Sequence, residues 1–243
     1  MNVRRAFQHP ARTASHVLIP DYPETPLPDR SKAGGTDRSR SRASLGLLAW
    51  YVLFWVWMAV SPVDRQNWVL ANILPALFVG LLVASHRCFP LSFASYALIT
   101  AFLSLHTIGV HYTYAQVPFG YWLEGVFDFQ RNHFDRIVHF CFGLLLTYPM
   151  YEGFVRFAQA GTWLAGSLSV IFPLGLSGAW EVLEAWVARA VHPELGEAYL
   201  GSQGDRWDAQ RDIAAALFGA ILCLVVMALA RRLLPRAVSS PRA

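Results

Sequence analysis

Residues 213–230, IAAALFGAILCLVVMALA, contain no ionisable side chain except that of Cys223. In an α-helix these 18 residues cover about 27 Å, close to the ~30 Å hydrocarbon thickness of a bilayer. A surface helix of a soluble domain keeps one polar face, and this stretch has none. The segment therefore predicts a transmembrane helix.

The composition of the whole chain is also that of a membrane protein. Of its 243 residues, 55% are hydrophobic and 15% are charged, against about 25% charged in soluble domains. The three cysteines form no C-x-x-C pair, and the net charge is only +4. This composition excludes a cytosolic enzyme, a nucleic-acid-binding protein and a secreted disulfide scaffold.

Comparable apolar stretches recur along the chain, so the predicted fold class is all-α: a polytopic membrane protein with six transmembrane helices in a bundle. The expected spans are 44–61, 68–85, 91–114, 134–157, 163–190 and 208–234. The fourth has the shortest uncharged core, 140–151, so a short, tilted or re-entrant element is its alternative. We expect a disordered, Pro- and Ser-rich basic arm at 1–42, the transmembrane domain at 43–235 and a short basic tail at 236–243. The first span begins too far from the N-terminus for a signal peptide.

The placement of Lys and Arg predicts the orientation, because cytoplasmic loops carry an excess of both. Six spans put both termini on one side. That side carries 14 of the 20 basic residues and the other side carries six. We therefore expect both termini to be cytoplasmic, with the basic arm attracted to anionic lipid.

Acidic residues gather on the opposite, outer side, which holds 11 of the 16 Asp and Glu residues. Three pairs at helical spacing lie within predicted helix ends, where each pair shares a helix face. The pairs are Asp135 with His139, Glu181 with Glu184, and Asp208 with Asp212. His106 and His111 lie near the outer end of the third span. Because topology places these helix ends in one layer, we expect the side chains to converge on one pocket.

A carboxylate within a span costs about 2.5–3.5 kcal/mol on insertion scales, so it normally faces the bundle interior and has a partner. Asp, Glu and His together supply the oxygen and imidazole ligands of a divalent cation. The predicted metal ligands are Asp135, His139, Glu181, Asp208 and Asp212, with His111 as an additional candidate. The predicted catalytic residues are Glu184 and Asp205, with Glu184 as a general base beside a metal-bound water.

Two other interpretations use the same residues: a structural salt-bridge network and a proton or ion path. In the network, Asp205 or Asp208 would cap the sixth helix, and Asp135 would cap the fourth helix or pair with Arg131 or Arg136. Glu184 would pair with Arg189, and Arg211 with Asp208 or Asp212. The Glu181–Glu184 pair resists this interpretation, because two like charges on one intramembrane face need a cation or a shared proton.

Three functions follow from these interpretations. The first is a divalent-metal-dependent enzyme that performs hydrolysis or transfer on an envelope or lipid-linked substrate. A proton- or cation-coupled transporter is the second, and a structural or partner-binding membrane protein is the third. The chain contains no G-x-S-x-G, H-E-x-x-H or P-loop motif, so nothing supports a nucleophilic Ser or Cys.

Two outer segments have predicted roles of their own. The aromatic stretch 111–122, HYTYAQVPFGYW, is typical of an interfacial belt, with a lid over the pocket as the alternative. In the stretch 191–207, Gly201, Gly204 and Asp205 predict tight turns that lead into the last helix.

Several motifs resemble those of the YjdF-like family of bacterial inner-membrane proteins, a family of unknown function. They are HTIGVHYTYAQVPFGY (106–121), RNHFDRIVHF (131–140), EVLEA (181–185) and GSQGDRWDAQRD (201–212). The resemblance covers about residues 44–234 and implies a polytopic inner-membrane protein. It implies family-typical positions at His111, Asp135, His139, Glu181, Glu184, Asp205, Asp208 and Asp212. A fainter resemblance to the VanZ-like membrane proteins of glycopeptide resistance rests on the Asp-x-x-x-His motif and on Asp208, Asp212 and Gly219. Neither resemblance implies an activity.

Overall fold

The computed structural model describes the backbone of residues 30–233 and the side chains of residues 42–233. Within 30–233 the chain forms α-helices and no strand, which confirms the all-α prediction. The helices are α1 (Arg30–Met58), α2 (Arg65–Ser85), α3 (Phe93–His111), α4 (Pro118–Phe127), α5 (Phe134–Arg156), α6 (Thr162–Ala190), α7 (Pro193–Leu200) and α8 (Asp208–Leu233).

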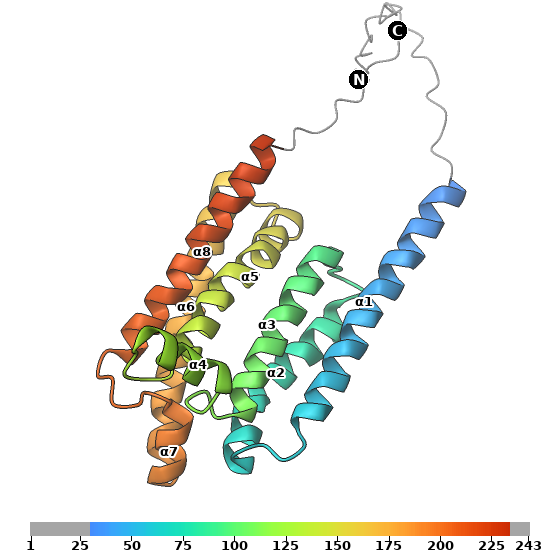
Figure 1. The fold of residues 1–243 in the computed structure, drawn as a ribbon. Helices are drawn as coiled ribbons and strands as arrows, with labels where there is room; N and C mark the ends of the chain where they lie inside the picture. Colours follow the sequence, from blue (N-terminus) through green and yellow to red (C-terminus); the bar gives the residue numbers. More distant parts are fainter. Residues whose placement is uncertain (1–29, 234–243) are drawn as a thin grey trace, which may run out of the picture.

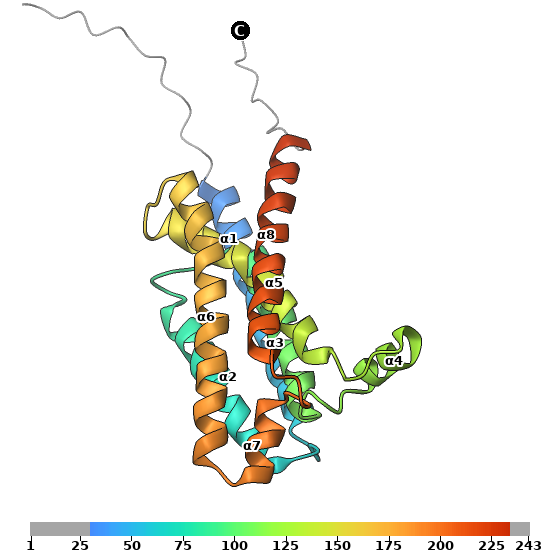
Figure 2. The same cartoon turned by 90° about the vertical axis from the view of Figure 1, so that its left-hand side faces the viewer.

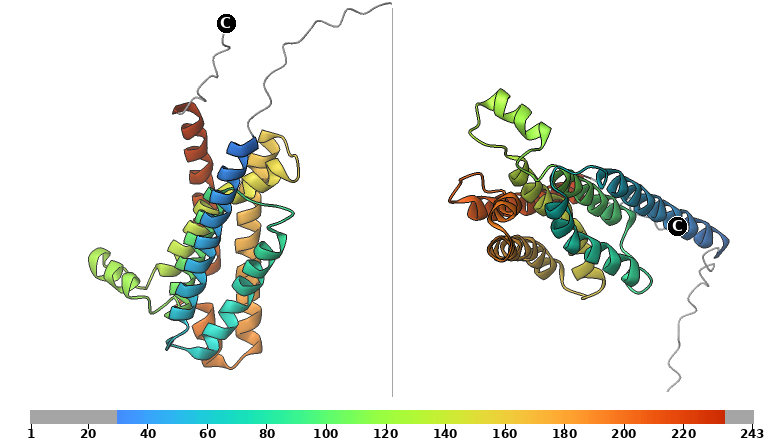
Figure 3. Two further views of the ribbon diagram at one scale, coloured as in Figure 1. Left: turned by 90° about the vertical axis from the view of Figure 1, so that its right-hand side faces the viewer. Right: turned by 90° about the horizontal axis from the view of Figure 1, so that it is seen from below.

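Six long helices form a bundle, and the short helices α4 and α7 lie at one of its ends (Figure 1). The central helix is α5, which packs against α3, α6 and α8, while α1 and α2 pack against α3. The first turn of α1 and the last turn of α8 lie at the end opposite α7 (Figure 2). Helix α4 extends sideways from the bundle (Figure 3). The first turns of α5 and α8 and the last turns of α3 and α6 therefore share one end.

Four helices, α2, α3, α6 and α8, are long and apolar enough to cross a membrane. The apolar part of α1 that carries described side chains, Arg42–Met58, is shorter. Helix α5 is long enough at 23 residues but carries charged residues at both ends. The chain is thus a helical membrane protein, and the six-span count and the orientation stay predictions.

Large apolar side chains cover the outside of the bundle. Trp163 is 81% exposed, Leu81 67% and Phe218 66%. In water, contiguous exposed apolar surface leads to association, whereas in a bilayer it contacts lipid. The interior instead contains small polar residues such as Thr107 and Thr147, both fully buried, as is common where helices pack within a membrane.

Helices α5 and α8 approach so closely that only glycine fits at two positions. A Cβ added to Gly143 would lie 1.9 Å from the carbonyl oxygen of Ala216, and one added to Gly219 would lie 2.0 Å from that of Phe140. Small residues at such crossings let helix backbones pack tightly. This contact fixes the position of the first turn of α5 relative to the first turn of α8.

The helix boundaries differ from the predicted ones mainly in the connections. Helix α1 begins at Arg30, so residues 30–42 are helical and the prediction that they belong to a disordered arm is wrong. The last proline of that region is Pro28, so no proline interrupts a helix that begins at residue 30. The rest of the predicted arm, 1–29, and residues 234–243 with the predicted tail lie outside the described residues. The predicted turns at Gly201 and Gly204 have φ of +64° and +83°.

Candidate functional site

Three helices bring the predicted acidic residues together at one end of the bundle. Helix α5 contributes Asp135 and His139 from its first two turns, α6 contributes Glu181 and Glu184, and α8 contributes Asp208 and Asp212. Five of the six side chains are buried and Glu181 is half-buried. The spacing of three or four residues places both members of each pair on one helix face, and their burial shows that this face is turned into the bundle.

Asp135, Asp208 and Asp212 form the tightest group. One carboxylate oxygen from each lies within 4.8 Å of the others. Two oxygens that bind one Ca²⁺ or Mg²⁺ from opposite sides are about 4–5 Å apart, given bonds of about 2.0–2.6 Å. Asp212 is fully buried, and neither of its carboxylate oxygens has a hydrogen-bond partner among the described residues. The spacing and the unsatisfied oxygens both fit a divalent cation.

His139 connects this group to α6. Its Nε2 lies 3.2 Å from Oε1 of Glu181 and 3.7 Å from Oδ1 of Asp135. Its Nδ1 lies 3.0 Å from the hydroxyl of Ser177. A second partner on the other ring nitrogen holds an imidazole ligand in one orientation. His139 is therefore fixed in the wall between α5 and α6.

Glu184 accepts a hydrogen bond from Nε1 of Trp180 at 2.6 Å. The structure thus gives Glu184 an indole partner, whereas the salt-bridge network would pair it with Arg189. A carboxylate held by one neutral donor keeps free lone pairs for a further proton or ligand.

Arginines neutralise the acids at the outer edge of the site. Arg131 donates to Asp208, and Arg136 donates to Asp205. Arg136 also lies 3.7 Å from Asp208, and its Nε lies 3.9 Å from Asp212. The network interpretation is right that the two arginines form ion pairs, but their partners are Asp205 and Asp208 rather than Asp135. The acids divide accordingly into an arginine-paired set and an inner set of Asp135, Glu181, Glu184 and Asp212.

Asp205 is the centre of the paired set. Besides Arg136 it binds Arg211, which the network interpretation would pair with Asp208 or Asp212. Its Oδ1 also accepts the backbone N–H of Trp207 at 3.0 Å. This N–H bond, and after it the neighbouring Arg211 and Arg136, lower the pKa of Asp205 below its usual 3.8. The geometry favours a positioning role for Asp205.

Two residues that the sequence analysis did not select tie the loops of the site together. The backbone N–H of Asn132 donates to Oε1 of Gln203 at 3.0 Å, and Nε2 of Gln203 donates back to the Asn132 carbonyl at 2.9 Å. The Asn132 side chain reaches the carbonyl of Val117 and packs on Gly120, where a Cβ would lie 1.7 Å from its Oδ1. The only signal in the sequence was their position inside two of the family-like motifs.

The two histidines of α3 separate. Nδ1 of His106 lies 2.5 Å from the hydroxyl of Tyr114, and its ring lies against Trp180. Nδ1 of His111 lies 2.8 Å from the carbonyl of Met58, at the end of α1. The structure thus places His106 beside the site and directs His111 toward α1.

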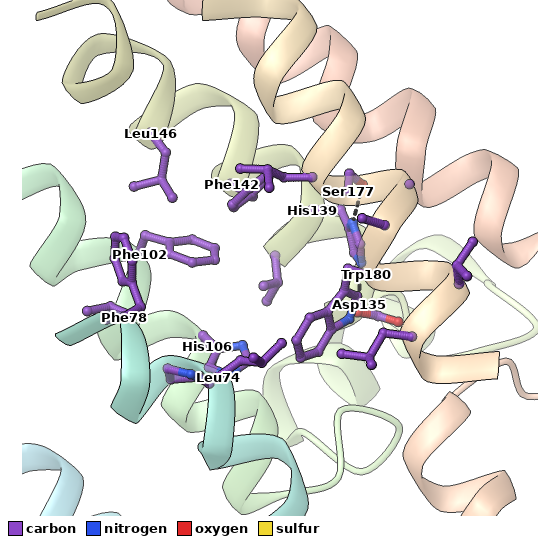
Figure 4. A pocket seen from close by; sticks show the side chains of 18 of the residues that line it. Leu74, Phe78, Phe102, His106, Asp135, His139, Phe142, Leu146, Ser177 and Trp180 are labelled. Carbon is purple, nitrogen blue, oxygen red and sulfur yellow. Dashed lines mark hydrogen bonds and ion pairs between the residues drawn. The ribbon is translucent and has the colours of Figure 1, made fainter. Parts of the chain in front are cut away.

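A cavity of about 750 Å³ adjoins the acidic residues. Its wall comes from α2, α3, α5 and α6 and includes Asp135, His139 and Trp180 (Figure 4). Most of its other lining residues are apolar, among them Phe78, Phe102, Phe142 and Leu146. Asp135 and His139 therefore border both the acidic group and this cavity.

Comparison with known proteins agrees with the membrane fold. Residues 43–233 match the family described as "Predicted membrane protein (DUF2238)". The chain is 32% identical over 181 residues to "Inner membrane protein YjdF" of Escherichia coli (strain K12), which covers 72% of this chain and 84% of that protein. No solved structure matches the chain.

Proposed function

Because this chain belongs to the DUF2238 family of predicted membrane proteins, we propose that it is an inner-membrane protein whose acidic site binds a divalent cation for hydrolysis or transfer on an envelope or lipid-linked substrate. The relative in Escherichia coli is named an inner membrane protein, which supports this location. The reaction class is our inference from the site alone.

The observation that carries the proposal is the environment of Asp212. Its carboxylate is fully buried and has no hydrogen-bond partner among the described residues. One of its oxygens lies within 4.8 Å of a carboxylate oxygen of Asp135 and of Asp208. Burying a charge without a partner costs several kcal/mol. A cation between the three carboxylates removes most of this cost, because it replaces the lost water with direct ligation.

The other residues take roles according to their contacts. His139 and Glu181, 3.2 Å apart, are the further candidate ligands. Glu184 is the candidate general base, since Trp180 is its only hydrogen-bond partner within the described part of the chain. A bound cation would lower the pKa of a water molecule enough to make it a nucleophile near neutral pH. Carboxylate-rich ligation favours Mg²⁺, Mn²⁺ or Ca²⁺, and a contribution from His139 shifts the preference toward Zn²⁺ or Fe²⁺.

The test is the metal content of purified protein. We expect the wild type to retain a stoichiometric divalent cation after dialysis, and Asp212→Asn to lose it, because the amide keeps the shape but not the charge. Asp128→Asn is the matched control, since Asp128 is exposed at the end of α4. A wild-type protein without any metal after incubation with Mg²⁺, Mn²⁺, Ca²⁺ and Zn²⁺ would end the proposal.

A structural network is the second candidate, and the arginine contacts favour it. Asp205 and Asp208 form ion pairs with Arg131, Arg136 and Arg211, so these two acids need no metal ion to balance their charge. If the whole site is structural, Glu181→Gln and Glu184→Gln should leave folding, metal content and cellular phenotype unchanged. A change in metal content in either variant would support the cation site.

A further inference from the structure

The cavity beside the acidic site is long, apolar and polar only at one end. Along α5 it extends from Asp135 to Met150, which corresponds to roughly 22 Å of helix. Toward Met150 its walls are apolar, from Phe102, Phe142 and Leu146. A path for protons or ions needs polar groups along its length, so the apolar part of this cavity fits a hydrocarbon better than an ion.

The cavity is only partly enclosed, and α2 and α6, which both line it, make few contacts with each other. Apolar residues of its wall on both helices are exposed: Leu74 (44%), Phe78 (37%), Leu176 (46%), Val182 (48%) and Trp186 (66%). In a membrane this apolar rim faces lipid rather than water. A molecule can therefore enter from the bilayer without crossing an aqueous phase.

Polar groups meet at the other end of the cavity, near its border with the acidic site. Asp135, His139, Ser177 and His106 lie there in the wall (Figure 4). His106 is 6% exposed, and its Nε2 has no hydrogen-bond partner of ordinary geometry among the described residues. A buried ring nitrogen without a hydrogen bond is destabilising, and a hydrogen bond to a bound polar head would remove this destabilisation.

We propose that the cavity binds a single-chain amphiphile from the bilayer, with its apolar chain between α2 and α6 and its oxygen-bearing head beside His106, Asp135 and His139. The polar head would lie beside Asp135, which is also a proposed ligand of the cation. Any reaction of the head therefore rests on the proposed function, whereas binding of the amphiphile's apolar chain does not. A volume of about 750 Å³ lies within the range of pockets for small molecules. A helix of a partner protein, about 10 Å wide and 22 Å long, would need roughly 1,700 Å³.

The test is photolabelling of the full-length protein in phosphatidylcholine nanodiscs by lysophosphatidic acid with a diazirine in its acyl chain. We expect label in the peptides around Phe78, Phe142 and Leu176, which line the cavity. The same diazirine chain on a two-chain phosphatidic acid should label the lipid-facing surface, such as α8 around Val225, which is 47% exposed. Equal patterns from the two probes would overturn the proposal.

A matched pair of variants checks that the label comes from the cavity. Ala179 is exposed in the cavity wall on α6, and Ala76 is exposed on α2 outside that wall. We expect Ala179→Trp to reduce cavity labelling by about tenfold, equivalent to ~1.4 kcal/mol, and Ala76→Trp to leave it unchanged. Both positions are exposed, so neither Trp has to enter a packed interior and both variants should fold, which their elution in size-exclusion chromatography verifies. Unchanged labelling in Ala179→Trp would contradict the proposal.

Metal analysis of the same samples separates this inference from the proposed function. Asp212 does not line the cavity, so Asp212→Asn should lose the metal and keep the chain label. Label without metal in the wild type would remove the proposed function and leave chain binding standing. Metal without cavity label would remove the chain binding alone.

Discussion

Asp212 is the residue with the greatest need for a ligand in the described part of the chain. It is fully buried, both of its oxygens are without hydrogen bonds, and its nearest cationic atom is Nε of Arg136 at 3.9 Å. Asp208, four residues earlier on the same face, is held by Arg131. The two neighbouring carboxylates thus differ: Asp208 is held by a direct contact from Arg131, whereas Asp212 has only the more distant guanidinium of Arg136.

This difference predicts the response of Asp212 to added cation. A cation at 100 times its Kd stabilises the folded state by about 2.7 kcal/mol, or roughly 5–10 °C in Tm for a chain of this size. We expect MgCl₂ or MnCl₂ to raise the Tm of the wild type by this amount and to leave Asp212→Asn unchanged. Without a metal ion, Asp212→Asn should be the more stable protein, because it no longer buries a carboxylate whose ion pair with Arg136 is as long as 3.9 Å and that has no hydrogen bond. Differential scanning fluorimetry in detergent measures both effects; equal shifts in the two proteins would count against the site.

Asp205 predicts a different dependence, on pH. Its bond from the Trp207 N–H and its arginine partners lower its pKa below 3.8 in the folded protein. As the pH falls, the unfolded chain takes up a proton first, so the stabilisation is complete above pH 3.8 and is lost as the pH falls through the lowered folded pKa. Wild type should therefore exceed Asp205→Asn in Tm at pH 6, and the difference should shrink toward pH 3. A difference that is the same at both pH values would show that these charged contacts do not stabilise the fold.

Among the helices, the contact of α5 with α8 decides whether the acidic group can form. Gly143 on α5 faces the backbone of Ala216 at a distance that admits no Cβ. Gly153, ten residues further along the same helix, has open space around it. The two glycines therefore form a matched pair of sites on one helix, one at the crossing and one away from it.

Substitution of each glycine by alanine should have opposite effects. Gly143→Ala forces the two backbones apart and should cost about 1–3 kcal/mol. The displacement of α8 from Asp135 should also weaken metal retention. Gly153→Ala should be neutral or stabilise by up to ~1 kcal/mol, because alanine is the better helix former. Thermal unfolding and metal content of the two variants give the answer, and similar Tm values would mean that the helices can separate at no cost.

Helix periodicity explains how much of the site the sequence could predict. The four-residue spacing of Asp135 and His139 places both on one face of α5, and the cost of a carboxylate in lipid predicts that this face is turned inward. The partners of Arg131 could not be predicted, because they lie more than 70 residues away on a loop and a helix whose positions depend on packing. His111 fails as a predicted ligand for a similar reason: five residues from His106, it faces α1.

The cavity could not be predicted from the sequence either. Its lining combines four helices that are distant in the chain, and residues such as Phe102 and Leu146 are indistinguishable in the sequence from ordinary lipid-facing or core residues. The space between these helices depends on how they pack, and the sequence does not show this. The helices themselves were predictable, since a long uncharged run determines a span whatever its neighbours.

For the whole molecule, the two ends of the bundle differ in charge. Glu194 on α7 and the acidic site lie at one end, and the first turn of α1 and the last turn of α8, with Arg231 and Arg232, lie at the other (Figures 1 and 2). The positive-inside rule predicts that the basic end lies in the cytoplasm. The acidic site would then face the periplasm, which determines which substrates can reach it.

Thiol labelling in cells tests this orientation. The chain has a native exposed cysteine toward one end and an exposed position for an introduced cysteine at the other. Cys88 is exposed just after α2, at the basic end, and Glu194 is exposed on α7 at the acidic end. With a maleimide that crosses the outer but not the inner membrane, we expect Glu194→Cys to be labelled in intact cells and Cys88 only after lysis. Each cysteine serves as the control for the other, once Cys88 is replaced by Ser in the Glu194→Cys protein. The reverse pattern would place the acidic site in the cytoplasm and would exclude periplasmic envelope substrates, because the same acids would then face the opposite compartment.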